Sequence, residues 1–361
     1  MFRATDEQVQ MGQIVADLLD ELDPLDPLSA LSSDVLNAPL WEGLVEMGIP
    51  GMMIPERWGG LELTFGHLSM VLEKSGYGVS RAPVLSNAIA TFALMTSGDD
   101  QANDHWLPRI AAGTALGTVA WDLSSDPSAL VGMQVSVDNR LTGQACFVLD
   151  ASTADLVLVL GTDEEGLHVF AVDTQSPGVS VSFMDGVDVR RSLGVVSLES
   201  VRGEQIALQG DTASYLERVL DWASIAVAVE QLGTAAHAVS LANEYVKVRK
   251  QFSRTIGSFQ AIKHRMADMQ IRLELARSAA YYAIDVIDSG SDDLRAAAAF
   301  ARTVCTESLT WIAAECVQVH GGIGYTWDYP AQLFVRRAKS TEHLLRPTSK
   351  LRDQLAVALL S

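Results

Sequence analysis

Cysteine is scarce in this sequence: Cys146, Cys305 and Cys316 are the only ones among 361 residues. Three is an odd number, so they do not make a complete disulfide framework, and their spacing is not that of a metal site. We therefore expect no metal centre. The thiols are interpreted as small core side chains of a protein in a reducing compartment.

Positively charged residues are also few. The chain has 26 Lys and Arg residues against 45 Asp and Glu residues, which gives a formal net charge of −19. Such a balance repels phosphate backbones at long range. We therefore expect no nucleic-acid partner.

Long uninterrupted hydrophobic runs are missing as well. The most apolar segment, 222–242, is broken by Glu230, Gln231 and His237 and does not make a convincing membrane span. The opening MFRATDEQVQ has no basic stretch followed by an apolar run, so we expect no secretory signal. These features predict a protein without a membrane span and a cytoplasmic location.

Hydrophobic periodicity divides the chain into three parts. Residues 6–115 carry mostly helical spacing, and helical spacing returns at 213. Between 117 and 209, short runs such as DLVLVLG and LHVFAVD alternate apolar and polar residues between turn-forming residues. We predict a mainly α protein with a central antiparallel β-barrel or sandwich, in domains 1–115, 116–212 and 213–361. The last domain is expected to be a four-helix bundle, with helices at 213–249, 259–289, 293–319 and 330–345.

One stretch of this acidic chain is strongly basic. Seven residues that carry or can carry positive charge crowd into 247–265, around the end of one predicted helix and the start of the next. Such a concentration indicates an anion site, although most cations of this kind lie on a solvated face. The residues are Lys247, Arg249, Lys250, Arg254, Lys263, His264 and Arg265.

Two motifs in the C-terminal part carry a resemblance. A family pattern R-x-x-F-G-x-x-I-x-x-F-Q followed by A-D-M is met by Arg249, Phe252, Ile256, Phe259, Gln260, Ala267, Asp268 and Met269. A second pattern, Q-x-x-G-G-x-G-Y-x-x-x-Y-P, is met by Gln318, Gly321, Gly322, Gly324, Tyr325, Tyr329 and Pro330. With the segment MGIPGMMIPERWGG and the helix–β–helix order, they resemble the acyl-CoA dehydrogenase family over nearly the whole chain.

The resemblance implies an FAD enzyme that removes two hydrogens from Cα and Cβ of an acyl-CoA thioester. It makes the anion the FAD pyrophosphate, which a planar guanidinium suits, and it implies that the flavin site is shared between subunits of a tetramer. Arg249 could instead simply favour a helix C-terminus, and the paired glycines also act as a helix cap. The cofactor-binding residues implied are Arg249, Gln251, Phe252, Gln260, Gln318, Gly321 and Gly322.

The catalytic carboxylate of the family is missing at both places where the family puts it. The two matching positions hold Leu345 and Ala223. Glu230 lies two helical turns after Ala223 in a segment that is apolar nearly all round, where a carboxylate must be paired, hydrogen-bonded or functional. We predict Glu230 as the base. The alternatives are a structural glutamate bonded to a neighbouring helix or to His237, or another carboxylate: Asp221, Glu342 or Asp328.

The β domain also departs from the family pattern. In place of the loop T-E-P-x-A-G-S-D and the segment W-I-T/S-N, which line the flavin ring, the chain has AWDLSSDPSAL and CFVLDASTADLV. Of these two segments of the chain, only Asp126 and the pair Ala154-Asp155 resemble the family's flavin-lining residues. The chain thus keeps the half of the flavin site given to a neighbour and has lost much of the half it would use itself.

This asymmetry leaves several interpretations open. The chain could be a divergent homo-oligomeric dehydrogenase, or one subunit of a heterotetramer with a paralogue, as in bacterial steroid degradation, which suggests a bulky sterol-derived CoA thioester. It could be a non-catalytic subunit that completes a partner's flavin site, or a flavin-free scaffold. An oxidase differs only in whether oxygen reaches the reduced flavin. In a dehydrogenase the electron acceptor would be an electron-transferring flavoprotein.

Overall fold

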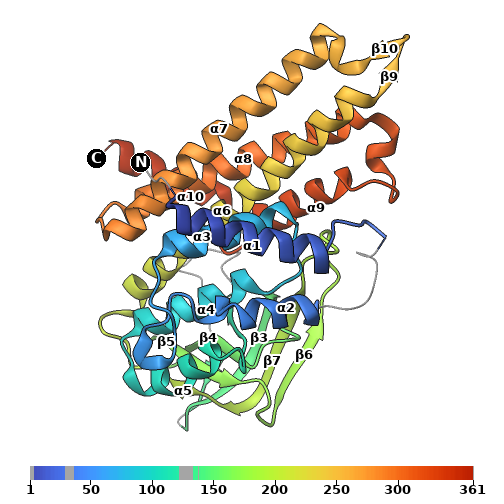
Figure 1. Cartoon of the computed structure of the whole chain (residues 1–361). Coiled ribbons are helices and arrows are strands. Elements are labelled where there is room, and N and C mark those ends of the chain that lie inside the picture. The colour runs from blue at the N-terminus through green and yellow to red at the C-terminus, as the bar shows by residue number, and fades with distance from the viewer. Residues whose placement is uncertain (1–3, 29–35, 122–132, 137, 361) are drawn as a thin grey trace.

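The chain folds into a helical N-terminal part, a curled β sheet and a bundle of long helices (Figure 1). The structure is a computed structural model, and it describes residues 4–28, 36–121, 133–136 and 138–360. The N-terminal part starts with a capping box, in which the Thr5 and Gln8 side chains bond each other's backbone N–H. Its helices are α1 (Asp6–Leu22), α2 (Ala38–Glu46), α3 (Phe65–Tyr77), α4 (Val84–Ser97) and α5 (Asp100–Ala111).

The predicted runs DLVLVLG and LHVFAVD are strands of a single eight-stranded sheet in the described part of the chain. Its order is β6-β7-β3-β2-β4-β5-β8, and β1 pairs with β4 outside this path. The prediction of a purely antiparallel domain was wrong in one respect, because β1 and β2 both run parallel to β4. A parallel pair requires a crossover, so segments distant in sequence decide it. The strands are β1 (Gly117–Ala120), β2 (Met133–Val135), β3 (Arg140–Leu149), β4 (Leu156–Thr162), β5 (Leu167–Asp173), β6 (Val179–Phe183), β7 (Leu193–Arg202) and β8 (Glu204–Gln205).

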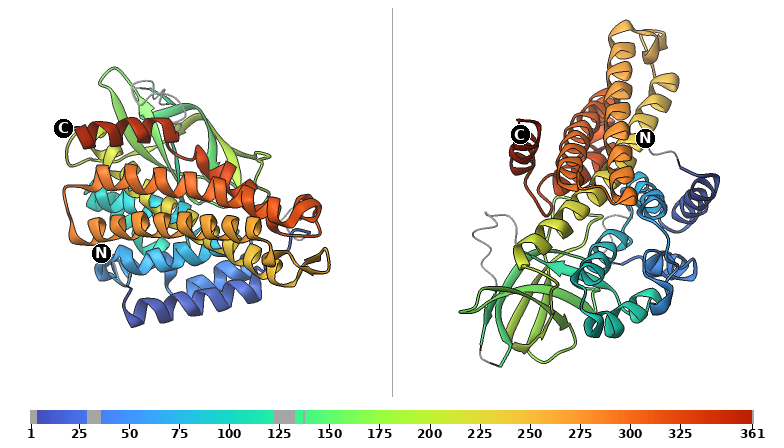
Figure 2. Two further views of the ribbon diagram at one scale, coloured as in Figure 1. Left: turned by 90° about the horizontal axis from the view of Figure 1, so that it is seen from above. Right: turned by 90° about the vertical axis from the view of Figure 1, so that its left-hand side faces the viewer.

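The C-terminal part is dominated by three long antiparallel helices. They are α6 (Thr212–Val248), α7 (Gln260–Ser289) and α8 (Leu294–His320), and they are joined by α9 (Ala331–Glu342) and α10 (Thr348–Leu360). Because these helices alternate in direction, the C-terminal ends of α6 and α8 lie at the same end of the bundle as the N-terminus of α7 (Figure 1). Figure 2 shows α7 and α8 lying side by side, with α1 on the far side of α3.

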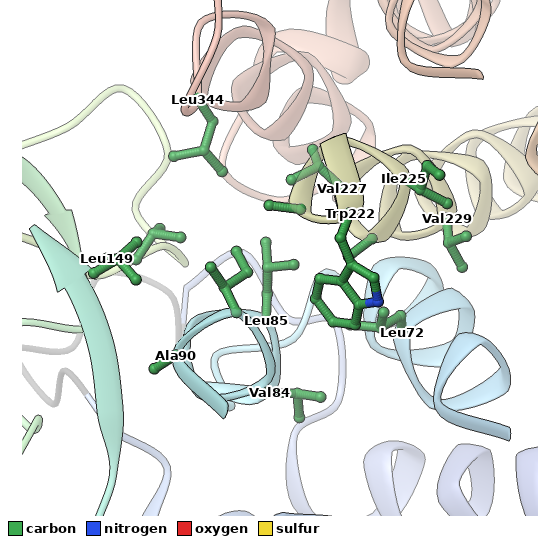
Figure 3. Packing of buried hydrophobic residues seen from close by; sticks show 14 of the residues in the cluster. Leu72, Val84, Leu85, Ala90, Leu149, Trp222, Ile225, Val227, Val229 and Leu344 are labelled. Carbon is green, nitrogen blue, oxygen red and sulfur yellow. The ribbon is translucent and has the colours of Figure 1, made fainter. Parts of the chain in front are cut away.

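Helix α6 runs through the centre of the molecule. The indole of its Trp222 is buried between α6 and the N-terminal helices (Figure 3). It stacks on Phe92 of α4 at 4.5 Å and lies edge-on to Phe65 of α3. By length and composition α6 is the one helix in the described part of the chain that could cross a membrane. However, 78% of its most apolar window is buried inside the protein, as in the core helix of a soluble domain.

Two glycines allow α3 and α6 to approach unusually closely. A Cβ atom at Gly233 would lie 1.8 Å from the carbonyl oxygen of Glu73, and one at Gly76 would lie 1.9 Å from that of Glu230. The hydroxyl of Thr234 donates to the carbonyl of Gly76 across the same contact, at 2.8 Å. The crossing therefore depends on the missing side chains, and it sets the position of Glu230.

We expect Gly233→Ala to destabilise the protein by about 3 kcal/mol, because the added methyl forces two packed helices apart. Thermal or urea unfolding followed by circular dichroism measures the effect. Gly12→Ala in α1 is the matched control, since its Cβ would meet Met70 at an ordinary 3.5 Å. That control should be neutral or slightly stabilising. Equal stability of the two variants would contradict the close crossing.

Candidate functional site

All seven predicted cofactor residues lie at one end of the helical bundle, and all are exposed. We call this end, residues 247–263 and 318–325, the bundle tip. Helix α6 and helix α8 are linked there by the ring of Tyr245, which lies 4.2 Å from that of His320. In Figure 1 the tip is at the opposite end of the molecule from the β sheet.

A small hairpin shapes the tip around Arg249. Arg249 ends α6, and the strands β9 (Lys250–Gln251) and β10 (Arg254–Thr255) form an antiparallel pair directly after it. The two residues between the strands, Phe252 and Ser253, both have positive φ, 53° and 64°, which is the backbone of a type I′ turn. The turn leaves the Phe252 side chain 88% exposed, which calls for a covering partner.

Two features of the tip suit a bound phosphate or nucleotide. Helix α7 begins at Gln260 without a side-chain cap, so its first backbone N–H groups are open to an anion. At the end of α8, a Cβ atom on Gly321 or Gly322 would meet nothing within 4 Å, and Gly321 has φ 65°. Backbone is therefore accessible next to the exposed Gln318. The tip has the groups that a dinucleotide pyrophosphate requires.

Apart from the bundle tip, the structure has a cavity between the β sheet and α9. Its volume is about 460 Å³. Leu345, at the position that matches the family's base, lines this cavity with φ 65° and presents no carboxylate. The titratable side chains on its described walls are Cys146, Asp185, Lys339 and His343. The lining residues are Val119, Trp121, Cys146, Phe147, Val148, Leu149, Asp185, Gly186, Val187, Leu193, Lys339, Ser340, His343, Leu344 and Leu345.

Sequence reasoning missed the indole in this cavity. Phe147, in the segment that stands in place of W-I-T/S-N, lines the cavity, and so does Trp121, directly after β1. Its Nε1 is buried and has no hydrogen-bond partner among the described residues. The parallel pairing of β1 and β4 brings this residue to the cavity, and that pairing was not predicted. Asp126, the other residue of interest in that segment, lies outside the described residues.

Glu230 lies in a network of buried ion pairs rather than on the cavity wall. It is only 6% exposed, and it pairs with Arg191 and, at 3.6 Å, with Arg337. Arg337 also binds Asp188 at 2.5 Å through Nε. Burial would raise the pKa of Asp188, but Arg337 and Arg191 outweigh it and hold that pKa below its ordinary value.

The same network continues to the N-terminal helices. Asp23, which follows α1, binds Arg190 at 2.8 Å and Arg81 at 3.1 Å, and the Arg190 guanidinium also donates to the Val79 carbonyl. All three parts of the chain therefore meet in one set of buried charges. That Glu230 is the base stays a prediction; in the structure each of its two carboxylate oxygens is paired with a guanidinium group. The arrangement favours the structural alternative.

Arg337 lies on the neighbouring helix α9, so one of the two structural partners considered from sequence is present at Glu230. His237 does not contact it; the ring bonds the carbonyl of Tyr77 at 2.6 Å and stacks on the Tyr77 ring. The arginines come from two similar short segments, DVRRS at 188–192 and VRRAK at 335–339. The paired arginines in these two segments were the sequence signal for the ion pairs of Glu230. Arginines among buried apolar residues need carboxylate partners.

The other candidate carboxylates are also accounted for. Asp221 binds Arg346 at 2.6 Å in the interior. Glu342 pairs with Lys339 at 2.8 Å, and Asp328 is exposed. Arg302 binds the carbonyls of Thr341 and Leu344, so the segment carrying Leu345 is held in place from α8 as well.

Asp150 is a carboxylate that sequence reasoning did not single out. It follows β3, adopts φ 51°, and accepts a hydrogen bond from the Ser86 hydroxyl at 2.5 Å. Burial raises the pKa of Asp150 to about 6, against the opposing effects of Ser86 and Arg191. This group holds its proton more tightly in the folded state than in the unfolded chain.

The raised pKa gives a pH-dependent prediction. Its stabilising effect is present below about pH 4 and is lost as the pH rises through about 6, so Asp150→Asn should gain relative stability over that interval. By pH 7 the gain over the unsubstituted protein should be about 3 kcal/mol, since the amide can still accept from Ser86. Urea unfolding at several pH values measures it. Stability profiles that run parallel across the interval would contradict the assignment.

Comparison with known proteins agrees with these features. The acyl-CoA dehydrogenase N-terminal domain matches residues 5–114, and the acyl-CoA dehydrogenase C-terminal domain matches residues 213–356. The acyl-CoA dehydrogenase IpdE2 of Mycolicibacterium smegmatis is 31% identical over 317 residues, covering 88% of this chain and 85% of that protein.

Two solved structures are similar over the whole fold. A chain of the ChsE4-ChsE5 complex of Mycobacterium tuberculosis superposes with a TM-score of 0.88 at 25% identity, covering 100% of this chain and 99% of that one. A chain of the steroid ACAD Tcur3481-Tcur3483, in a variant form, has a TM-score of 0.87 at 27% identity and 99% coverage of both. With these matches, the predicted fold is confirmed, and the chain belongs to the acyl-CoA dehydrogenase family.

Proposed function

We propose that this chain is a subunit of an oligomeric, FAD-dependent dehydrogenase of acyl-CoA thioesters, and that its bundle tip completes the flavin site of a neighbouring subunit. One observation carries the proposal: seven residues from the hairpin and the adjoining ends of α6, α7 and α8 gather, exposed, at the end of the bundle opposite the β sheet (Figure 1). The chain's own cavity lies elsewhere, between the β sheet and α9. A shared site requires a second subunit.

Each part of the tip has a proposed role. The Arg249 guanidinium binds the pyrophosphate, while Gln251, Phe252 and Gln260 lie around it on the hairpin and the first turn of α7. Gln318 and the open backbone at Gly321 and Gly322 contact the adenosine half. When bound, the flavin supplies the hydride acceptor for Cβ; the residues of this chain bind and orient the cofactor.

The cavity favours a mixed assembly over a homo-oligomer. Its base position is Leu345, and Glu230, the predicted base, is engaged by Arg191 and Arg337. A paralogue that carries its own carboxylate would then provide the reacting site, and this chain would provide the phosphate-binding end of it. A homo-oligomer that uses Glu230 remains the alternative prediction.

The substrate and partners follow from the relatives. Similarity to a steroid ACAD and to a two-protein ChsE4-ChsE5 complex supports a bulky, sterol-derived thioester and a heterotetramer. We further propose a cytoplasmic protein whose electrons pass to an electron-transferring flavoprotein. The division into domains at 115 and 212 stays a prediction.

The test is to purify the chain alone and together with candidate paralogues, and to measure flavin per chain and particle mass. We expect little flavin on the chain alone and one flavin per pair of unlike chains in the complex. One flavin per chain in a homo-oligomer would favour the Glu230 alternative. No flavin in any combination would reject the proposal and leave a scaffold.

A further inference from the structure

Three aromatic rings from separate elements meet beside the bundle tip. Tyr245 lies in the last turn of α6, His320 ends α8, and Tyr329 lies shortly before α9. The centroid of the His320 ring is 4.2 Å from that of Tyr245 and 4.8 Å from that of Tyr329, and the two tyrosine centroids are 6.1 Å apart. The three rings thus pack on one another as aromatic pairs. We call Tyr245, His320 and Tyr329 the ring cluster.

The imidazole of His320 is the buried member of the ring cluster. The residue is only 4% exposed, and its Nδ1 lies 2.7 Å from the carbonyl oxygen of Cys316, one helical turn earlier. Because a carbonyl oxygen only accepts, Nδ1 carries the proton and Nε2 is left as a bare acceptor. Nε2 is buried and has no hydrogen-bond partner among the residues that the structure describes. The ring is therefore held by aromatic packing and by its own helix.

The surroundings of His320 favour the neutral imidazole. The titratable groups that face the ring are the phenols of Tyr245 and Tyr329 and the thiol of Cys316, and no carboxylate in the described part of the chain bonds it. A proton added at Nε2 therefore creates a buried cation without an acceptor. Burial lowers the pKa of His320 below its ordinary value of 6.5, although the bond to the Cys316 carbonyl opposes this effect.

The ring cluster lies between two groups of residues that are proposed to bind the cofactor. On the α6 side, the backbone N–H of Arg249 donates to the carbonyl of Tyr245 at 2.9 Å. On the α8 side, the backbone N–H of Gly321, next to His320, donates to the carbonyl of Gln318. The Tyr245 hydroxyl also donates to the carbonyl of His320 at 3.4 Å. Contact between Tyr245 and His320 thus links the helix end that carries Arg249 to the one that carries Gln318.

We propose that His320 is a positioning residue of the flavin site, whose neutral ring holds the ends of α6 and α8 at the separation that one dinucleotide requires. The inference rests on the proposed function, because it needs Arg249 and Gln318 to bind the same cofactor. In this role His320 acts through Tyr245 and through the turn at Gly321 rather than by touching the cofactor. The contribution of the neutral ring is complete above the ordinary pKa of 6.5 and is lost as the pH falls below it.

His320→Ala and His320→Phe test whether the ring positions the cofactor residues. His320→Ala should lower the affinity of the assembled complex for FAD by about tenfold or more, since it breaks both ring pairs of His320. His320→Phe keeps an aromatic ring in place and should retain the affinity to within a few-fold. The matched control is Leu309→Ala, which truncates a buried side chain of the same helix and should lower Tm without changing the affinity. Fluorescence titration of the flavin-stripped complex with FAD measures the affinity.

The pH profile of the same titration separates positioning from a purely structural role. Between about pH 7.5 and about pH 5.5 the parent complex should lose several-fold in affinity, with about tenfold as the limit for one proton at a group of ordinary pKa 6.5. His320→Phe should show no such loss. Protonation of His264, exposed near the start of α7, adds positive charge and acts in the opposite direction, so His264→Gln should keep the loss.

Amide hydrogen exchange provides a measurement that needs no flavin. In the chain alone, His320→Ala should speed exchange at residues 245–256, on the α6 side, although the substitution is on α8. Leu309→Ala and His320→Phe should leave exchange there unchanged.

Three results would each overturn the inference: equal losses of affinity in His320→Ala and His320→Phe, parallel pH profiles of His320→Phe and the parent complex, or unchanged exchange in His320→Ala. A parent complex that binds no FAD would instead reject the proposed function, and the exchange measurement would still test the link between the two helix ends.

Discussion

Arg249→Ala is expected to lower the affinity of the assembled complex for FAD by about 100-fold or more, the largest binding effect among these predictions. A planar guanidinium makes paired, charge-assisted hydrogen bonds to phosphate oxygens. Removing it leaves a charged ligand group without its main partner, which costs a few kcal/mol. The complex should then lose flavin on gel filtration, as measured from the absorbance of flavin per chain.

The matched control is Lys250→Ala, which removes a neighbouring exposed cation from β9. It changes the net charge equally but leaves the fork in place, so flavin should be retained to within a few-fold. Arg249→Lys should be intermediate, because an ammonium keeps the charge without the planar pair of donors. If Arg249→Ala and Lys250→Ala retain flavin equally well, the bundle tip is not a pyrophosphate site.

Glu230→Gln is expected to destabilise the fold by about 3–5 kcal/mol, because it removes the carboxylate that Arg191 and Arg337 share and leaves Asp188 as their remaining buried acidic partner. For a chain of this size the loss corresponds to a fall in Tm of about 5 °C. Glu342→Gln, which breaks only the exposed pair with Lys339, should change stability by less than about 1 kcal/mol. Differential scanning fluorimetry at matched concentrations compares the two.

The same variant separates the two roles considered for Glu230. If the residue is structural, the complex containing Glu230→Gln still bleaches its flavin on adding substrate, at a temperature where it is folded. Loss of bleaching with flavin bound and Tm unchanged would instead identify the base. Should Glu230→Gln not fold, Glu230→Met combined with Arg191→Met removes both charges of the pair and offers a milder replacement.

The local patterns along the chain were sufficient for much of the fold. Helical and alternating spacing placed the three long bundle helices to within a few residues, because burial on one face imposes a fixed period. The motif around Arg249 and the motif around Gln318 could each be predicted to bind the cofactor, because each matches a family pattern by itself. Nothing local, however, showed that β1 would pair parallel to β4 and bring Trp121 to the cavity wall.

By itself, the sequence determined the order of helices and strands, the family, and which side chains suit a phosphate. Only the tertiary structure decided that those side chains meet at one exposed tip, and that Glu230 is held by Arg191 and Arg337. Glu230 and its partners lie on separate elements, 39 and 107 positions apart in sequence. A charge buried in a helix demands a partner, but helix packing alone chooses which one, since contacts between distant segments leave no periodic trace in either of them.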